Sequence, residues 1–320
     1  MSTPMTEHVL AIDIGGTKIA VAVIDASGTV VTEAQAPTPA TLDPEAIFAP
    51  AAAAIARIAA DASWDGPVRV GIGSAGPIDG PAGTISPVNI PGWRRYPIVD
   101  RVRTVVAAAV DAAPETVAVG LAGDGHCFAL GEHWLGAGRD WTSMVGMVLS
   151  TGVGGGAVID NRLFTGVTGN SVHLGHISVN AWGERCVCGC HGCVEMYARG
   201  PAMVAEARAR GWDGGTDAQA LTADARAGHP VAVAVIDHGM RALAAGIAST
   251  ATNLDIRTFV LGGGVSKAGA VVFDPLRRHL EDFAALPFVQ PLEVRPAELE
   301  NAGILGAAAL ALGDARFGTA

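Results

Sequence analysis

The sequence predicts an α/β protein with two similar lobes. Apolar, β-branched runs alternate with segments of helical spacing along the chain, which is typical of α/β folds. The run VLAIDIGGTKIAVAVIDASGTVV (residues 9–31) predicts a meander of three strands. A second unit, MVGMVLSTGVGGGAVIDNRLFTG (residues 144–166), again has an apolar strand, a Gly-rich turn and a strand ending in Val-Ile-Asp. This repeat predicts that a similar hairpin opens each of two lobes that face a cleft.

The first half continues with further helices and strands. The segment PEAIFAPAAAAIARIAADA (residues 44–62) has helical spacing and strong helix formers. We expect a strand at 68–72, then a loop rich in Gly and Pro as far as Trp93, and a helix from about 96 to 109. TVAVGLAGD (residues 116–124) then predicts another strand.

The second half follows the same logic. GHCFALGEHW (residues 125–134) predicts a helix directly after the strand that ends at Asp124. Beyond the second hairpin the chain is mostly helical, interrupted by one strand and turn, TFVLGGGVSKAG (residues 258–269).

Bulk composition excludes several classes of protein. Half of the 320 residues are hydrophobic and 16% are charged, so a disordered chain is excluded. The formal net charge of −10 argues against a nucleic-acid surface, which needs clustered Lys and Arg. The start, MSTPMTEHVL, lacks the basic flank and apolar run of a signal peptide. Charged residues or glycines interrupt the apolar segments before they reach the roughly 20 residues of a membrane span. We therefore expect a cytoplasmic protein with no membrane or nucleic-acid partner.

One Gly-rich motif resembles a dinucleotide-binding turn. GIGSAG (residues 71–76) fits G-x-G-x-x-G, but that turn works only where its last glycine opens a helix. Here Pro77, Gly80 and Pro81 follow, so no helix is expected. The sequence also contains no G-x-x-x-x-G-K-[ST] motif of a P-loop.

Two other Gly-rich turns, DIGGTK and STGVGGG, stand between expected strands. Successive backbone N–H groups without side chains form an anion-binding concavity, and threonine hydroxyls add donors. A single such turn would be read as a tight hairpin, but two at equivalent points of two lobes favour a shared phosphate chain. A third turn, in LGGGVSKAG, would let a flat nucleoside approach the backbone. The residues expected at the nucleotide from these turns are Gly15, Gly16, Thr17, Thr151, Gly152, Gly154, Gly262, Gly263 and Gly264, while Lys18 faces either solvent or phosphate.

Four of the five cysteines lie within CVCGCHGCVE (residues 186–195). A disulfide is disfavoured in the cytoplasm, and a redox pair would need a thioredoxin-like βαβ unit that the sequence lacks. The thiols of Cys186, Cys188 and Cys193 with the imidazole of His176 make a closed tetrahedral Zn²⁺ set of the structural kind. Cys190 could compete as a ligand.

These motifs, in this order and spacing, resemble those of the ROK family of sugar kinases and related repressors. The resemblance implies an actin/hexokinase-like (ribonuclease H-like) fold of two lobes with an inserted structural zinc loop. It places the lobes at 1–122 and 123–301, the zinc loop at 176–193, and a last helix at about 302–318 that packs back on the first lobe. The motifs are DIGGTK, SPVNIPGW, GDGHCFALGE, STGVGGG, LGHI, CVCGCHGCVEMYARG, LGGGV and ENAGILGAAALAL.

The resemblance also implies a reaction, the transfer of the γ-phosphoryl of ATP, with Mg²⁺, to the C6 hydroxyl of glucose or a glucose-like hexose. Asp124 would take the hydroxyl proton, and the residues independently allow this because Asp124 ends an apolar strand and begins a helix; the alternative is a helix cap. Asp13 would lie near the Mg²⁺–phosphate assembly, or would merely cap the Gly turn. Polyphosphate is an open alternative donor.

The sugar and metal residues are carried over from the same resemblance. His176 would offer one ring nitrogen to zinc and the other to the sugar. The implied sugar-binding residues are Asn89, His176 and Glu195, and the implied zinc ligands are His176, Cys186, Cys188 and Cys193, which leaves Cys190 spare.

Two departures from the family pattern bear on the substrate. Gly123 stands where Asn usually precedes the catalytic Asp, and His173 stands where Glu usually lies three residues before the zinc His. His173 could still touch the sugar, since positions i and i+3 share a helical face. An amino-sugar kinase for N-acetylmannosamine, N-acetylglucosamine or another aminohexose is therefore an alternative.

A non-catalytic sugar-sensing regulator is the rival of another class. Repressors of the family carry a helix-turn-helix segment ahead of the kinase-like part, and the position of the phosphate turn from Asp13 leaves no room for one. The resemblance further implies a homodimer or homotetramer.

Overall fold

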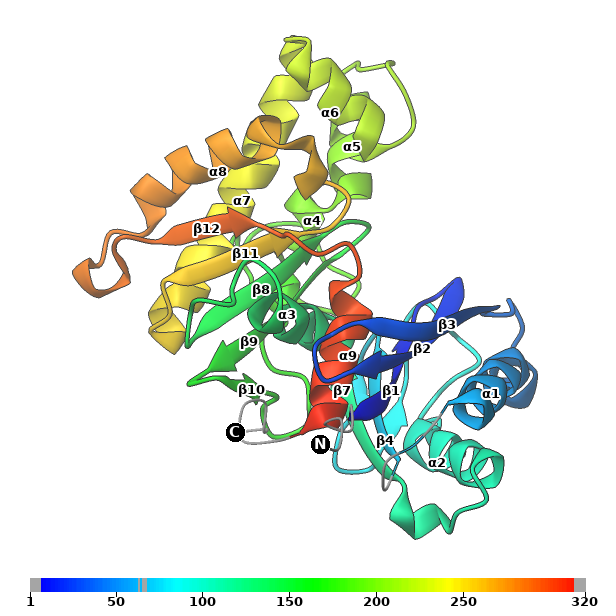
Figure 1. The fold of residues 1–320 in the computed structure, drawn as a ribbon. Helices are drawn as coiled ribbons and strands as arrows, with labels where there is room; N and C mark the ends of the chain where they lie inside the picture. The colour runs from blue at the N-terminus through cyan, green and yellow to red at the C-terminus, as the bar shows by residue number, and fades with distance from the viewer. Residues whose placement is uncertain (1–6, 63, 65–67, 314–320) are drawn as a thin grey trace. The chain divides into compact units, whose positions relative to one another are not determined.

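The computed structural model describes residues 7–62, 64 and 68–313, which form two compact units (Figure 1). Unit 1 contains the described residues of 1–142, 156–171 and 299–320, and unit 2 contains residues 143–155 and 172–298. These units differ from the expected lobes, 1–122 and 123–301. The reason is that helix α3 (Asp124–Trp134) packs along helix α9 (Ala302–Leu312), so the chain stays with unit 1 beyond residue 122.

Unit 1 is built on a five-stranded sheet of order β3-β2-β1-β4-β7. The predicted meander is confirmed, because β1, β2 and β3 pair antiparallel. β4 then pairs parallel with β1, and β7 pairs parallel with β4. The strands are β1 (His8–Ile14), β2 (Lys18–Asp25), β3 (Val30–Pro37), β4 (Arg69–Ser74) and β7 (Ala118–Gly123).

One face of this sheet packs against helices α1 (Pro44–Asp61) and α2 (Ile98–Ala109), which lie together in Figure 1. Alternate side chains of a strand point to opposite faces. Leu10, Ile12 and Ile14 accordingly share a buried core with the apolar side chains of both helices. The opposite face of β1 therefore presents the odd-numbered residues, among them Asp13.

The opposite face of the sheet is lined by glycines, which lets α9 approach the strands closely. A Cβ on Gly71 would lie 1.8 Å from the carbonyl oxygen of Ala307, and one on Gly120 would lie 3.1 Å from Leu310 Cγ. The GIGSAG motif is thus a strand against which a small-residue helix packs. The rejection of a dinucleotide-binding turn is confirmed, because no helix follows β4.

The remaining elements of unit 1 are short. The predicted helices 44–62 and 96–109 and the strand 68–72 appear as α1, α2 and β4, with boundaries shifted by one or two residues. The last helix ends at Leu312, while residues 314–318 of its predicted extent lie outside the described residues. The short elements are β5 (Ile78–Asp79), β6 (Thr84–Ile85), the 3₁₀ turn η1 (Pro114–Thr116) and β10 (Arg162–Phe164).

The second sheet has the order β10-β9-β8-β11-β12, and its strand β9 (Val153–Ile159) begins in unit 2 and ends in unit 1. The predicted repeat of strand, Gly-rich turn and strand is confirmed by β8 (Met144–Leu149) and β9. β11 (Thr258–Gly262) pairs parallel with β8 and with β12 (Glu293–Pro296).

Helices cover the sheet of unit 2, with α7 and α8 lying side by side (yellow and orange in Figure 1). The helices are α4 (Glu195–Ala198), α5 (Gly200–Ala209), α6 (Ala218–Arg226), α7 (Pro230–Leu254) and α8 (Ala270–Phe283). The 3₁₀ turns are η2 (Leu174–His176), η3 (Ser266–Ala268) and η4 (Pro287–Val289).

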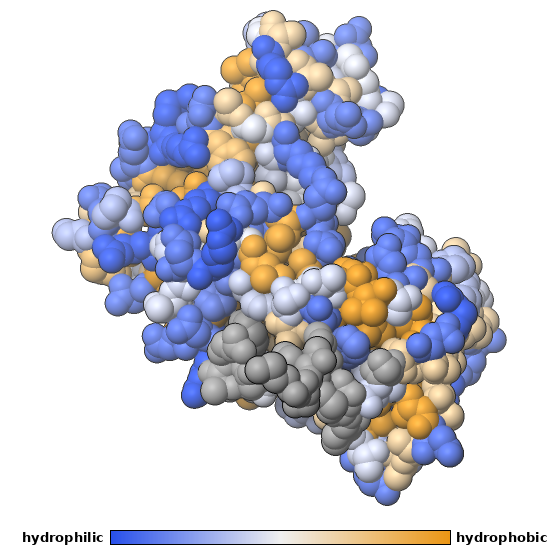
Figure 2. Space-filling model, viewed as in Figure 1, coloured by the Kyte–Doolittle hydropathy of each residue, from blue (hydrophilic) through white to orange (hydrophobic). Residues whose placement is uncertain are grey.

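Helix α7 is, among the described residues, the one helix long and apolar enough to cross a membrane by length and composition. Inside its most apolar window, 61% of the residues are buried in the protein. Such a buried helix is what the core of a large unit requires. Figure 2 shows hydrophilic residues over most of the face in view, with apolar residues in separate patches.

Candidate active site

The DIGGTK turn joins β1 to β2 in unit 1. Gly15 N donates to the carbonyl oxygen of Lys18 over 3.0 Å, and the Thr38 hydroxyl donates to the carbonyl oxygen of Gly15 over 2.9 Å. Thr38 N also donates to the carbonyl oxygen of Thr17. The side chains of Thr17 and Lys18 are exposed. The turn is therefore held by Thr38, the residue that follows β3, and its exposed side chains supply a hydroxyl and a cation.

Asn89 lies directly against this turn. A Cβ on Gly16 would come within 2.6 Å of Asn89 Nδ2, so glycine lets the amide lie directly on the turn. Asn89 is exposed and lies in a turn in which Ile90 N donates to the carbonyl oxygen of Pro87 over 3.2 Å. Two residues expected to bind different ligands, the sugar and the nucleotide, therefore lie together in unit 1.

Asp13 is enclosed by glycines of two neighbouring elements. Its Oδ2 would lie 3.1 Å from a Cβ on Gly303, at the start of α9, and its Oδ1 3.8 Å from one on Gly73, on β4. Burial, and to a smaller extent the nearby Asp124, raises the pKa of Asp13 to about 6, and Lys18 opposes this shift. Two carboxyl groups thus lie close together at the end of the sheet, which is an arrangement suited to a Mg²⁺ ion.

Asp124 is the first residue of α3 and directly follows β7. Its Oδ1 accepts a hydrogen bond from Gly125 N over 2.7 Å, at the helix N-terminus, where a carboxylate is favoured. The predicted position, at a strand end and a helix start, is confirmed. The alternative of a helix cap is compatible with this geometry, since the carboxylate accepts from the first turn.

Gly123 is glycine because an imidazole occupies the space where its side chain would begin. A Cβ at this position would lie 2.9 Å from His126 Nδ1. The His126 ring is buried, and its Nε2 lies 2.9 Å from Ser171 Oγ. The Ser171 hydroxyl donates its one hydrogen to the carbonyl oxygen of Phe164, so Nε2 of His126 is the donor in this pair. Sequence reasoning missed His126 and Ser171, since a contact 45 residues apart leaves no local pattern.

Cys127 is the one cysteine outside the CVCGCHGCVE segment, and the sequence analysis did not place it near the site. Its thiol is fully buried and would touch a Cβ on Gly73 at 2.9 Å. Burial raises the pKa of Cys127 well above its ordinary value, and the carboxylates of Asp13 and Asp124 raise it further. The thiol therefore stays protonated and fills space behind the two carboxyl groups.

In unit 2, the STGVGGG turn connects β8 to β9. Ser150 N donates to the carbonyl oxygen of Gly152 over 2.9 Å, which closes the turn. Glu195 Oε2 accepts a hydrogen bond from Val153 N, also over 2.9 Å. Gly152 leaves room for this carboxylate, because a Cβ there would lie 2.9 Å from the same oxygen.

A cavity of about 730 Å³ opens beside this turn, within unit 2. Gly264, of the third expected turn, lines it, whereas Gly262, the last residue of β11, and the following Gly263 do not. Gly263 has a φ of +94° and lies against the backbone of Leu149, so it admits no side chain. The lining residues include Ser150, Thr151, Gly200, Pro201, Val204, Asp217, Gln219, Thr222, Arg226, Gly264, Val265 and Lys267.

This cavity mixes apolar surface with two cations and several hydroxyls, which suits a nucleotide. Its residues from α5 and α6 were not foreseen, because they come from helices whose sequences carry no motif. Of the residues expected at the nucleotide, only Thr151 and Gly264 are among those that line it.

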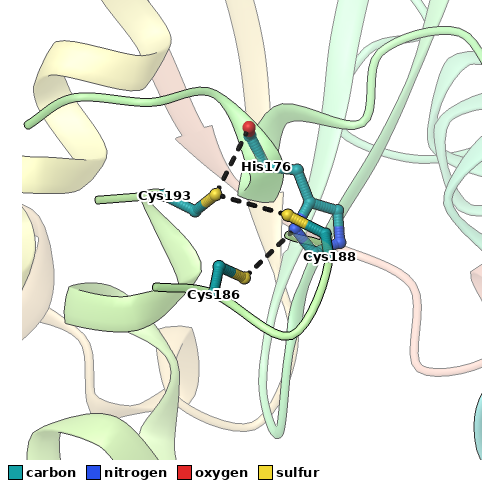
Figure 3. Close-up of side chains that lie close together, drawn as sticks. All are labelled: His176, Cys186, Cys188 and Cys193. Carbon is teal, nitrogen blue, oxygen red and sulfur yellow. Dashed lines mark hydrogen bonds between the residues drawn. The ribbon is translucent and has the colours of Figure 1, made fainter. Parts of the chain in front are cut away.

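The four expected zinc ligands come together in unit 2 (Figure 3). One donor atom from each of His176, Cys186, Cys188 and Cys193 lies within 4.8 Å of the others. Cys186 Sγ is 3.8 Å from His176 Nδ1, and Cys188 Sγ is 3.6 Å from Cys193 Sγ. Three thiols and one imidazole at these separations fit a closed tetrahedral zinc site. Cys190 is exposed and lies outside the set.

His173 directly precedes η2, and His176 is the last residue of this turn. Their rings are 6.1 Å apart and nearly parallel, at 16°. His173 is thus three residues from His176 across a 3₁₀ turn, and the sequence spacing brings the two rings close together.

A model of the ROK family matches residues 9–314. The chain belongs to the ROK family. Glucokinase of Streptomyces coelicolor is 34% identical, over 94% of this chain and 96% of its own length. N-acetylmannosamine kinase of Citrobacter koseri is 35% identical, over 95% of this chain and 99% of its own.

A solved ROK glucokinase from Streptomyces griseus, in complex with glucose and AMPPNP, has a TM-score of 0.76 and 33% identity. The match covers 96% of this chain and all of that one. The predicted α/β, actin/hexokinase-like fold of the ROK sugar kinases is thereby confirmed, and it is built on two five-stranded sheets.

Proposed function

We propose that this ROK protein is an ATP-dependent sugar kinase that transfers the γ-phosphoryl group to the C6 hydroxyl of a hexose, glucose or a glucose-like sugar. The observation that carries the proposal is the placement of Asp124 beside Asp13 and the DIGGTK turn in unit 1. Its likeness to glucokinases and N-acetylmannosamine kinases over nearly the whole chain supports the same activity.

Asp124 has the role of general base in this proposal. It accepts the proton of the attacking hydroxyl, while the N-terminus of α3 stabilises its charge before transfer. Asn89, whose side chain lies against the DIGGTK turn, would donate to a sugar hydroxyl from the same unit. Because phosphoryl transfer depends on positioning and charge neutralisation, these few groups are sufficient on the acceptor side.

Asp13 and the cavity of unit 2 have roles in binding the phosphoryl donor, ATP with Mg²⁺. The Asp13 carboxylate would hold Mg²⁺, which neutralises the phosphate charge during transfer. Thr151, Lys267 and Arg226 line a cavity large enough for a nucleoside with its phosphates. Polyphosphate has no base or ribose to fill such a cavity, so the structure favours ATP over it.

Zinc has a positioning role in the proposal. The ion would be held by the three thiolates and by Nδ1 of His176, the ring nitrogen that lies nearest Cys186. The Nε2 atom of His176 and the nearby Glu195 would then contact sugar hydroxyls. When bound there, zinc would hold these four side chains together and would supply no redox chemistry.

An amino-sugar kinase is the second candidate. His173 stands parallel to His176 in place of an acidic residue, so an imidazole replaces a carboxylate among the expected sugar contacts. The N-acetylmannosamine kinases among the relatives also support an amino sugar as the substrate. A non-catalytic sensor is disfavoured by the paired carboxyl groups. We further infer a cytoplasmic homodimer or homotetramer, which light scattering of the purified protein would test.

A panel of sugars tests the proposed activity. ADP release is measured with ATP and Mg²⁺ over glucose, mannose, glucosamine, N-acetylglucosamine and N-acetylmannosamine. Turnover of one sugar far above the others identifies the acceptor, and absence of turnover on all of them, with sugar binding intact, indicates the sensor.

Asp124→Asn tests the assigned base. We expect turnover to fall roughly 10²–10⁴-fold, because a missing general base costs about this much, while sugar affinity measured by calorimetry is retained. Turnover near the wild-type value would show that another group removes the proton.

A further inference from the structure

Glu195 links the metal-binding loop to the second Gly-rich turn. Its Oε2 accepts a hydrogen bond from Val153 N over 2.9 Å, although the two residues are 42 positions apart in the sequence. The carboxylate is 12% exposed, so this bond is largely shielded from water. Gly152 is required beside it, since a Cβ there would lie 2.9 Å from Glu195 Oε2. The family resemblance assigns Glu195 to the sugar alone, and this bond is a second role.

The same junction holds the other end of the turn. Gly200 N, at the start of α5, donates to the carbonyl oxygen of Ser150 over 2.9 Å. The turn from 150 to 153 is thus fixed at one end by α5 and at the other by Glu195. Both Ser150 and Gly200 line the 730 Å³ cavity, so the position of this turn shapes the cavity.

Arg199 forms an ion pair with the Glu195 carboxylate. Its Nη1 lies 3.8 Å from Glu195 Oε1, one helical turn away. Arg199 Nε is buried and has no hydrogen-bond partner in the part of the chain that the structure describes. The guanidinium therefore partly compensates the charge of a carboxylate that bonds a turn expected to bind phosphate.

Glu195 follows the metal ligand Cys193 by only two residues. Val194 between them is fully buried, and its N donates to the carbonyl oxygen of Ile177 over 3.0 Å. Met196 N bonds back to Cys193, so the ligand and Glu195 belong to one hydrogen-bonded turn. A change in the position of Cys193 must therefore shift Glu195 as well.

We propose that Glu195 is a positioning residue for the nucleotide, through which metal loading of the cysteine loop sets the affinity of the STGVGGG turn for ATP. The inference rests on the proposed function, in which this turn contacts the nucleotide phosphates. It predicts coupling between metal and nucleotide even when no sugar is bound. Such coupling is reciprocal, so the nucleotide also strengthens metal retention.

The test measures AMPPNP binding with Mg²⁺ by calorimetry, without sugar. In Glu195→Ala the bond to Val153 N is lost, and we expect affinity to fall about tenfold. Glu195→Gln keeps an acceptor oxygen and should stay within about threefold of wild type. Glu184→Gln is the matched control, since it alters an exposed carboxylate of the same loop, and it should leave affinity unchanged.

Metal removal supplies the second arm. Stripping zinc from the wild type should weaken AMPPNP binding by about the same tenfold, whereas stripping Glu195→Ala should weaken it little further, because the link is already broken. Circular dichroism and zinc content verify folding and loading. If Glu195→Ala does not fold, the stripped and loaded wild type decide the question.

The outcomes separate the inference from the proposed function. If the loaded wild type fails to bind AMPPNP, the proposed function is wrong. If it binds, but neither Glu195→Ala nor metal removal weakens the binding, Glu195 serves the sugar alone and the inference is overturned. Equal losses in the Ala and Gln variants would also overturn it, since the accepting oxygen would then not matter.

Discussion

At the scale of single residues, the carboxyl group of Asp13 is held where ionisation is costly. Glycines of β4 and α9 surround it, and burial raises its pKa to about 6, above the ordinary 3.8. A raised carboxyl pKa means that the folded state loses stability as the pH rises from about 4 through 6. A cation bound to the carboxylate would offset this cost.

Asp13→Asn should therefore stabilise the metal-free protein at pH 8. A shift of about two pKa units corresponds to about 3 kcal/mol, which is an upper limit for the gain. The gain should shrink as the pH falls through 6 and vanish below about 4, where the wild-type carboxyl is protonated in both states. Urea unfolding at pH 4, 6 and 8 measures it, and a gain that does not vary with pH would contradict the burial argument.

Gly123 and His126 form a matched pair at the start of α3. Asn at position 123 would force its Cβ to within 2.9 Å of an imidazole that Ser171 holds in place. We expect Gly123→Asn to destabilise the protein by about 1–3 kcal/mol, as overpacking usually does.

Adding His126→Ala should recover most of that loss, although His126→Ala alone is destabilising. The double-mutant cycle in urea unfolding measures this coupling. Strictly additive effects would show that the imidazole moves aside at no cost.

At the scale of elements, the contact between β4 and α9 depends on missing side chains. Gly71→Ala would place a methyl group 1.8 Å from the carbonyl oxygen of Ala307, which neither backbone can avoid. We expect a loss of at least about 3 kcal/mol, seen as a lower urea midpoint. Gly80→Ala is the control, because its nearest atom is at 3.6 Å, and it should be close to neutral.

The metal loop offers an equally direct comparison between two of its cysteines. Cys186 is buried and belongs to the four-ligand set, whereas Cys190 is exposed and outside it. Cys186→Ser should lose stoichiometric zinc and lower the melting temperature, since structural zinc contributes folding energy. Cys190→Ser should keep one zinc per chain and the wild-type melting temperature. If Cys190→Ser lost its zinc, Cys190 would be a zinc ligand and the assigned ligand set would be wrong.

At the scale of the whole molecule, the chain does not divide into two consecutive halves. Unit 1 takes residues from the start, the middle and the end, because α9 returns to the first sheet and packs along α3. Consequently Asp13, near one end of the chain, lies beside Gly303, near the other.

The sequence by itself determined the features that depend on neighbouring residues. Strand alternation, the Gly turns at 15–16 and 152–156, the position of Asp124 and the spacing of Cys186, Cys188 and Cys193 are all local, so backbone geometry and ligand chemistry reveal them. The boundary between the two units could not be predicted in this way. It depends on the packing of α3 on α9, and neither segment has a sequence pattern that indicates this contact.

Only the tertiary structure decided the contacts between distant segments. It made GIGSAG a packing face for α9, set His126 in the space beside Gly123, and joined Glu195 to Val153. These contacts depend on which surfaces meet when the elements pack. Side-chain volumes and individual hydrogen bonds determine these contacts. Neither produces a periodic pattern in the sequence from which the contacts could be predicted.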